Sequence, residues 1–272
     1  MKKFVLIVLT IITASILAFS LVACGNNVPT DKLLRLNFCN NDFVETFVYS
    51  VSGKVGDSVV NGTLTFKISP SDGGYVIERT QEMDDGTKFF GRVKFSKSGS
   101  FLPSESLLTT EKNGEKSTEK IVYDGKKLRF FVAKGDSIPV ETPATEHEIA
   151  SPYYDNMQFY TIIRGATFDK KFNLAFNTFA PRENRVVKLQ CSLGSTENKK
   201  YTVSGNEGAV DCQAVYVALT SAPVTTNQAF RAYYAKSDIE LANQYKLKQV
   251  LVEFVENGFT YTLKDASATS AS

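Results

Sequence analysis

Alternation of apolar and polar residues with a period of two constrains the fold of this chain more than any other feature. Leu64, Phe66 and Ile68 are separated by Thr65 and Lys67. Similar alternation recurs in residues 89–96, 187–193 and 259–264. Successive side chains of a β-strand point to opposite faces of the sheet, so each segment predicts a strand with one buried face.

Short turn motifs separate these segments. Asn113-Gly114 and Asn257-Gly258 are two of several Asn-Gly and Asp-Gly pairs, which adopt the positive φ values that tight hairpins require. We expect strands near residues 43–52, 60–69, 74–82, 88–96, 101–110, 117–123, 127–133, 172–179, 185–193, 199–204, 210–219, 227–235, 246–256 and 259–264. Because the connections are too short for helical crossovers, the predicted sheet is antiparallel.

One segment departs from the alternation and predicts a helix over about 152–164. Ser151 is a typical N-cap, Pro152 suits the first helical position, and Gly165 follows the expected end. Apolar residues at helical spacing form one stripe on this segment. The predicted fold class is mainly β, a single strongly curved antiparallel sheet or open barrel with one packed helix.

The N-terminus has the pattern of an export signal. Lys2 and Lys3 precede a run of uncharged residues that ends in Leu21-Val22-Ala23-Cys24, which resembles the bacterial lipobox. We expect a signal peptide at 1–23, lipidation of Cys24 that includes palmitate, and a protein anchored to the cell membrane on its extracytoplasmic side. The alternative is an uncleaved signal anchor, because the uncharged run is long enough to span a bilayer. Both alternatives give the same topology.

The rest of the chain predicts one domain. Residues 24–32 are a polar stretch that suits a lipidated tether, and residues 33–265 contain the strands and the helix of the β-rich domain. Residues 266–272 are only Ala, Ser and Thr, which predicts a disordered tail with too little apolar content to fold.

Charge argues against nucleic acid as a partner. The chain has 31 basic and 29 acidic residues, and the two lysines of the signal account for the whole difference. A balanced mature protein lacks the basic surface that binds phosphate backbones. The sequence does not determine an oligomeric state.

The cysteines allow one disulfide. With Cys24 assigned to lipid, Cys39, Cys191 and Cys212 remain, which is an odd number. Cys191 and Cys212 lie in neighbouring predicted strands, so they are the candidate pair. The alternative, which we favour, is that each is a small buried apolar residue with a free thiol. No Cys-x-x-Cys pair exists and there is one histidine, so we expect no zinc site, and no other metal or cofactor.

Residues that could carry catalysis are few. His147 is the single histidine, and no Gly-x-Ser-x-Gly motif accompanies it. Asp84-Asp85 is followed by Gly86, which favours a hairpin turn over an acid pair. Glu78 and Glu82 share one strand face, but no tryptophan is present to stack on a sugar ring. We therefore expect no catalytic residues and no enzyme.

From about Tyr123 to Leu263 the order of features resembles a family of bacterial envelope proteins known as a domain of unknown function. The residues that carry the resemblance are Asp155, Tyr160 and Arg164 in the helical segment, Gly208 to Val215 with Cys212 and Val215 as a Cys-x-x-Val motif, and Tyr261-Thr262-Leu263 at the last hairpin. The resemblance implies a β-rich body, and some relatives look like open barrels that carry lipoproteins or bind lipids. It implies no catalytic residues.

Several strands carry large apolar residues on both faces, for example Phe89 with Phe90 and Phe130 with Phe131. Such a sheet either encloses an apolar ligand or is covered on both sides by ordinary core. The first functional hypothesis is a non-catalytic, lipid-anchored envelope protein that binds an apolar or amphipathic ligand, or an envelope partner, on the concave side of the sheet. The alternatives are a structural or interaction module without a pocket, and an envelope hydrolase that uses His147 or a carboxylate pair.

Overall fold

The computed structural model describes residues 42–96, 101–220 and 230–271. Cys24, Cys39, the predicted signal peptide and the tether lie outside the described residues. The strands are β1 (Phe43–Val55), β2 (Ser58–Ser71), β3 (Gly74–Met83), β4 (Lys88–Ser96), β5 (Pro103–Lys112), β6 (Glu115–Asp124), β7 (Lys127–Lys134), β8 (Thr145–Glu148), β9 (Leu174–Ala180), β10 (Arg185–Val203), β11 (Asn206–Leu219), β12 (Phe230–Ala235), β13 (Ile239–Glu240), β14 (Lys246–Leu247), β15 (Leu251–Glu256) and β16 (Phe259–Ser270). The helical elements are α1 (Phe159–Arg164) and the 3₁₀ turn η2 (Pro181–Glu183).

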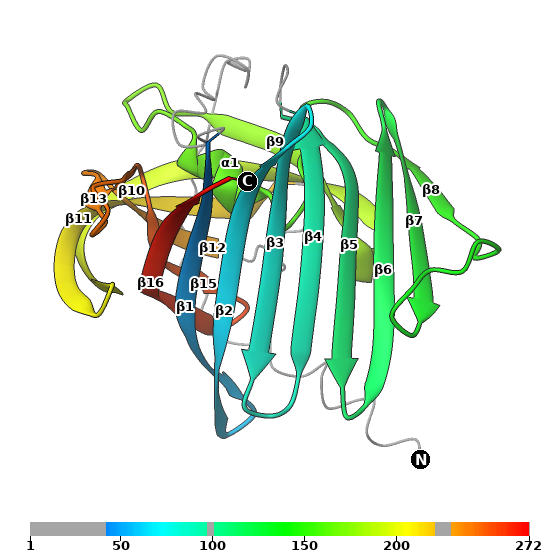
Figure 1. Cartoon of the computed structure of the whole chain (residues 1–272). Helices are drawn as coiled ribbons and strands as arrows, with labels where there is room; N and C mark the ends of the chain where they lie inside the picture. Colours follow the sequence, from blue (N-terminus) through cyan, green and yellow to red (C-terminus); the bar gives the residue numbers. More distant parts are fainter. Residues whose placement is uncertain (1–41, 97–100, 221–229, 272) are drawn as a thin grey trace.

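One antiparallel sheet contains most of the described chain. Its 14 strands follow the order β8-β7-β6-β5-β4-β3-β2-β1-β16-β15-β12-β11-β10-β9, and β13 pairs with β14 in a separate two-stranded sheet. The strands β1 to β8 form the broad wall at the front of Figure 1. The long connection from β8 to β9 contains α1. The later strands then extend the sheet on the other side of β1, where β16 pairs with β1.

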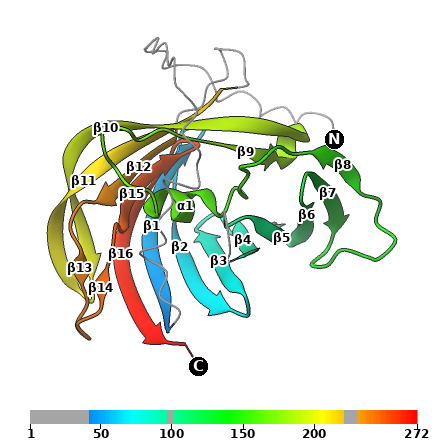
Figure 2. The ribbon, with the colours of Figure 1, turned by 90° about the horizontal axis from the view of Figure 1, so that it is seen from above.

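The sheet is strongly curved and not closed. Seen from above, it curls around α1 until its two edge strands, β8 and β9, lie near each other (Figure 2). Residues 152–154 lie along β9, where Tyr153 forms a parallel bridge with Asn177 and the Tyr154 amide donates to the Asn177 carbonyl at 3.0 Å. The predicted fold class, a mainly β protein with one curved antiparallel sheet and one packed helix, is confirmed.

The hairpin turns agree with the Asn-Gly and Asp-Gly motifs. Asn113 and Gly114 have φ values of 54° and 79° between β5 and β6, and Asn257 and Gly258 have 52° and 82° between β15 and β16. Two consecutive residues with positive φ form the type I′ turn, which matches the twist of the flanking strands. These motifs therefore fix where the strands end.

The helix is shorter than the prediction of 152–164. It begins at Phe159, after Gln158 as N-cap, and ends at Arg164. Pro152 follows a cis peptide bond instead of opening a helical turn. The predicted start is wrong because the backbone of residues 152–154 hydrogen-bonds to the edge of β9.

The predicted disordered tail is also wrong. Residues 266–270 belong to β16 and pair with residues 43–47 of β1. Ala266 and Ala268 are 3% and 5% exposed, on the inner face of the sheet. Small side chains suit this position because they face bulky neighbours on β1, and the ladder hydrogen bonds come from the backbone and do not require apolar content.

Candidate functional site

The concave side of the sheet is filled by aromatic side chains. Phe254 stacks on Tyr261 with ring centroids 4.1 Å apart, and it contacts Tyr160 of α1 at 4.6 Å and Tyr49 of β1 at 5.6 Å. A cavity of about 20 Å³ remains beside Tyr49, Phe66 and Tyr160. That volume suits about one water molecule. The interior at this place is therefore packed core, and it leaves no room for an acyl chain.

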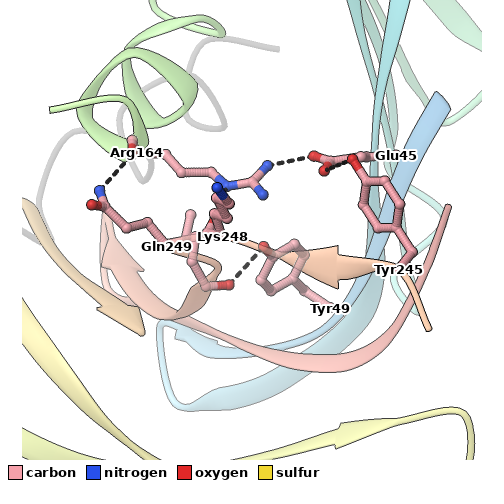
Figure 3. Close-up of polar contacts among 7 residues, drawn as sticks. Glu45, Tyr49, Arg164, Tyr245, Lys248 and Gln249 are labelled. Atoms are coloured by element: carbon pink, nitrogen blue, oxygen red, sulfur yellow. Dashed lines mark hydrogen bonds and ion pairs between the residues drawn. The ribbon is translucent and has the colours of Figure 1, made fainter. Parts of the chain in front are cut away.

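A buried ion pair joins the end of α1 to β1. The Arg164 Nη1 donates to Glu45 Oε2 at 2.6 Å, and both side chains are 4% exposed. The Tyr245 hydroxyl donates to the other carboxylate oxygen of Glu45 at 3.0 Å (Figure 3). The Arg164 guanidinium also lies over the Phe47 ring at 5.1 Å. We call Glu45, Arg164 and Tyr245 the ion-pair cluster.

Backbone groups complete the surroundings of Arg164. Its Nε donates to the Lys248 carbonyl at 2.7 Å, and the Gln249 side chain donates to the Arg164 carbonyl at 2.6 Å (Figure 3). Beside them, the Tyr49 hydroxyl donates to the Leu251 carbonyl at 2.8 Å. Hydrogen bonds from a charged donor, such as the one from Arg164 Nε, are among the stronger polar contacts in proteins. The cluster therefore holds α1 against β1 and the segment before β15.

A second buried carboxylate holds the segment that leads into α1. Asp155 is 2% exposed, and its carboxylate accepts hydrogen bonds from the Met157 amide at 2.9 Å and from the Tyr123 hydroxyl of β6 at 2.8 Å. Burial raises the pKa of the Asp155 carboxyl, and it raises the pKa of the Tyr123 phenol for the same reason. Asp155 and Arg164 thus fix α1 from both ends.

The motif residues Asp155, Tyr160 and Arg164 are therefore structural in the described chain. The Tyr160 carbonyl accepts the Tyr234 hydroxyl at 2.8 Å, so this residue links α1 to β12. Tyr261 stacks in the aromatic core. None of these side chains lies where a soluble substrate could reach it, because each of the four is no more than 4% exposed.

His147 lies in the edge strand β8. Its Nε2 is 3.0 Å from Asn184 Oδ1, and its ring contacts the Phe179 ring at 4.8 Å. The first contact reaches the β9–β10 connection, and the second reaches β9 itself. The structure thus places His147 where the two edges of the sheet approach each other.

The acidic residues that the sequence suggested as pairs form hydrogen bonds and ion pairs within the fold. In the β3–β4 turn, Asp85 Oδ1 accepts the Thr87 amide at 2.9 Å and Asp84 Oδ2 accepts the Asn61 amide at 3.1 Å. The first of these hydrogen bonds is the main reason why the pKa of Asp85 is lowered. This is the hairpin turn that Gly86 indicated. Glu78 forms an exposed ion pair with Lys67 at 3.8 Å.

Cys191 and Cys212 are free and buried thiols. In the β10–β11 ladder Cys191 is opposite Val217 and Cys212 is opposite Glu197. Five ladder positions separate the two cysteines, about 17 Å along a strand, whereas a disulfide needs Cα atoms within about 7 Å. This excludes the disulfide that the sequence allowed. Burial raises the pKa of the Cys212 thiol to about 12 and also raises that of Cys191.

A larger cavity lies on the surface, between the tip of the β10–β11 hairpin and β13. Its volume is about 250 Å³. It is lined by Tyr201, Val203, Ser204, Asn206, Glu207 and Gly208 of the hairpin and by Ile239, Glu240, Leu241 and Ala242. We call it the hairpin cavity. It combines an apolar floor, where Val203, Ile239 and Leu241 are buried, with exposed polar side chains at its rim.

Sequence reasoning missed Glu45 and Tyr201. Glu45 is the one acid on a strand face that otherwise carries Phe47, Tyr49 and Val51, so a charge on an apolar face was the available signal. Tyr201 is opposite Gly208 in the ladder, and only the pairing register shows this. In the part of the chain that the structure describes, no group of three His, Cys, Asp or Glu residues could hold a metal ion. Within the same residues, none of the helices has the length and apolar character to cross a membrane.

Comparison with known proteins identifies the family of this chain and a solved structure with a similar fold. No curated protein matches the sequence. A similar solved structure is the crystal structure of a β-barrel-like protein of the domain of unknown function DUF1849 from Brucella abortus, with a TM-score of 0.52 and 11% sequence identity, covering 85% of this chain and 99% of that chain. At this identity the likeness shows the fold alone. Residues 48–264 match the family described as "Protein of unknown function (DUF3108)", and the chain therefore belongs to that family.

Proposed function

We propose that this protein is a non-catalytic binding module, held at the extracytoplasmic face of a membrane by lipid on Cys24, that recognises its ligand or partner at its surface. The packed core around α1 is the observation that carries the proposal. The cavity beside Tyr49, Phe66 and Tyr160 is about 20 Å³, and the buried charged side chains Glu45, Arg164 and Asp155 hold α1 in place. Recognition is therefore left to the outside of the body.

The surroundings of the candidate catalytic residues support a binding role. His147 is 3.0 Å from an amide oxygen and lies against an aromatic ring, whereas a general base needs an orienting group and a nucleophile within hydrogen-bond reach. The Asp84 carboxylate accepts a hydrogen bond from the Asn61 amide of β2, and the Asp85 carboxylate accepts one from Thr87 within its own turn. These contacts favour a binding module over a hydrolase.

The lipid tether is supported by the order of features at the N-terminus. A basic start, an apolar run and Leu21-Val22-Ala23-Cys24 occur in the order that export and lipidation need. Two or more acyl chains on one cysteine anchor a protein firmly, whereas a single chain binds a membrane only reversibly. The β body would then face the extracytoplasmic side.

Replacement of Cys24 tests the tether. We expect the Cys24→Ala variant to lose incorporation of labelled palmitate and to move from the detergent phase to the aqueous phase in Triton X-114 partitioning. Cys39→Ala is the matched control and should behave as the wild type. Equal palmitate labelling and detergent partitioning of the Cys24→Ala variant and the wild type would contradict the proposal.

Native mass spectrometry of the wild-type protein, released from its own membrane, tests surface recognition against an enclosed ligand. Because the core around α1 is packed, we expect the mass of the lipidated polypeptide without a retained second lipid. A stoichiometric lipid that survives gentle release would instead favour the apolar-ligand hypothesis.

A further inference from the structure

The hairpin cavity is built from two walls that are both attached to β16. The Ser204 amide, in the β10–β11 turn, donates to Asp265 Oδ1 at 2.8 Å. The Asn243 side chain, between β13 and β14, donates to the Ala268 carbonyl at 3.0 Å. Because both walls are fixed to one strand of the main sheet, the cavity is preorganised, and less ordering is needed when a ligand binds.

An aromatic ring forms part of the wall of this cavity. Tyr201 lies against Gly208, so closely that a Cβ atom at Gly208 would be 2.6 Å from the Tyr201 Cζ. A glycine within a strand often marks a place where another group approaches the backbone closely. The face of an aromatic ring carries partial negative charge, and it attracts the weakly positive C–H groups of a sugar ring.

The rim of the cavity carries hydrogen-bonding groups of one charge type. Ser204 and Asn206 supply a hydroxyl and an amide, and Glu207 and Glu240 are the charged residues among the ten lining residues, which include no lysine or arginine. The Glu207 side chain is on the opposite face of β11 from Gly208, and Glu240 is opposite Lys246 in the β13–β14 ladder. Asn206 is on the same face of β11 as Gly208, so its amide and the Ser204 hydroxyl can form hydrogen bonds with the hydroxyl groups of a ligand beside Tyr201. A phosphate or carboxylate ligand would instead meet like charge.

We propose that the hairpin cavity binds one ring of a saccharide that carries no anionic group, with the ring against Tyr201 and its hydroxyl groups at Ser204 and Asn206. The volume of about 250 Å³ is just below the range of about 300–1,000 Å³ that small-molecule sites occupy, which suits a single ring of a longer glycan. This inference rests on the proposed binding function and names its site and its class of ligand.

Titration of the full-length protein with three trisaccharides tests the proposal. Maltotriose and N,N′,N″-triacetylchitotriose are the uncharged probes, and trigalacturonic acid is the anionic counterpart. The protein is held in octaethylene glycol dodecyl ether micelles, because detergents with sugar headgroups would compete. Saturation-transfer NMR detects contact of each probe with the protein, and titration gives its Kd.

Two matched pairs of variants locate the site. In the same hairpin, Tyr201 lies across Gly208 and Tyr216 lies across Gly194. Tyr216 is not among the residues that line the cavity. Tyr201→Ala removes the ring, and Gly208→Ala adds a Cβ that forces the ring to move. Tyr216→Ala and Gly194→Ala make the same changes at the other tyrosine. Far-UV circular dichroism and the urea midpoint verify that each variant is folded.

We expect at least one uncharged trisaccharide to bind, with a Kd that rises about tenfold in Tyr201→Ala and Gly208→Ala, a loss of about 1.4 kcal/mol. Tyr201→Phe, Tyr216→Ala and Gly194→Ala should leave the Kd within about twofold of the wild type, less than about 0.4 kcal/mol. The proposal is overturned if neither uncharged probe binds, if Tyr201→Ala leaves the Kd unchanged, if Tyr216→Ala weakens binding equally, or if trigalacturonic acid binds as well.

The outcome is separable from that of the proposed function. The palmitate and partitioning measurements report on lipid at Cys24, whereas the saccharide titrations report on the hairpin cavity. Absence of saccharide binding would overturn this inference and leave the palmitate, partitioning and native-mass results as they stand.

Discussion

Glu45 and Arg164 show how much a single pair of residues contributes to this fold. Both side chains are 4% exposed, so removal of one charge leaves the other buried without its partner. Breaking a buried ion pair in this way costs about 3–5 kcal/mol. We therefore expect Glu45→Gln, which keeps the shape of the side chain, to lower the free energy of unfolding by that amount in urea titrations.

An exposed ion pair provides the control for Glu45. Lys67 and Glu78 are 3.8 Å apart with side chains 48% and 34% exposed, and such surface pairs contribute about 0–1 kcal/mol. Glu78→Gln should therefore leave the urea midpoint nearly unchanged. If Glu45→Gln lowered the free energy of unfolding as little as Glu78→Gln does, the buried charge of Arg164 would not depend on Glu45 for its stabilisation.

Asp155 gives the protein a defined dependence of stability on pH. Burial raises the pKa of Asp155 in the folded state above its ordinary value of 3.8, so the folded state binds more protons than the unfolded state between the two pKa values. Stability must then fall as the pH rises from 3.8 through the folded pKa. In Asp155→Asn this contribution is absent.

The measurement for Asp155 is a series of urea titrations between about pH 4 and pH 7 on both proteins. The difference in unfolding free energy, wild type minus Asp155→Asn, should decrease as the pH rises. Use of a difference cancels the other carboxyl groups, including Asp85 and Glu105, whose lowered pKa values act in the opposite direction. A difference that increased with pH would mean that Asp155 is stabilised as a carboxylate.

At the scale of elements, β16 shows what composition cannot predict. The tail contains only small and polar residues, yet Ala268 is buried on the inner face, opposite Glu45, while Thr269 points outward. We expect Ala268→Asp to lower the free energy of unfolding by about 3 kcal/mol or more, because it buries an uncompensated charge beside another carboxylate.

Thr269→Asp is the matched substitution one residue further along, and it should change stability by less than about 0.5 kcal/mol because the side chain is exposed. Urea titration of the two variants distinguishes a paired strand from a disordered tail. In a disordered tail both substitutions would be equally mild, and the pairing of β16 with β1 beyond Asp265 would be contradicted.

At the scale of the whole molecule, the curvature of the sheet brings aromatic side chains together around α1. Aromatic residues of the strands meet Tyr160 of α1, and the helix lies within the curve of the sheet (Figure 2). Apolar residues on both faces of a strand were compatible with an enclosed ligand or with ordinary core. The contacts of Phe254 with Tyr49, Tyr160 and Tyr261 show ordinary core at this place.

The sequence by itself determined the fold class and most strand positions, because alternation and Asn-Gly or Asp-Gly turns are local signals that each segment carries on its own. It also contained the lipobox-like Cys24, which stays a prediction. Only the tertiary structure decided that residues 152–154 extend along β9, that 266–270 pair with β1, and that Glu45 meets Arg164 across 119 residues. It also placed Tyr201 beside Gly208 and β13. These features depend on which strands become neighbours, and a local pattern does not specify its partner.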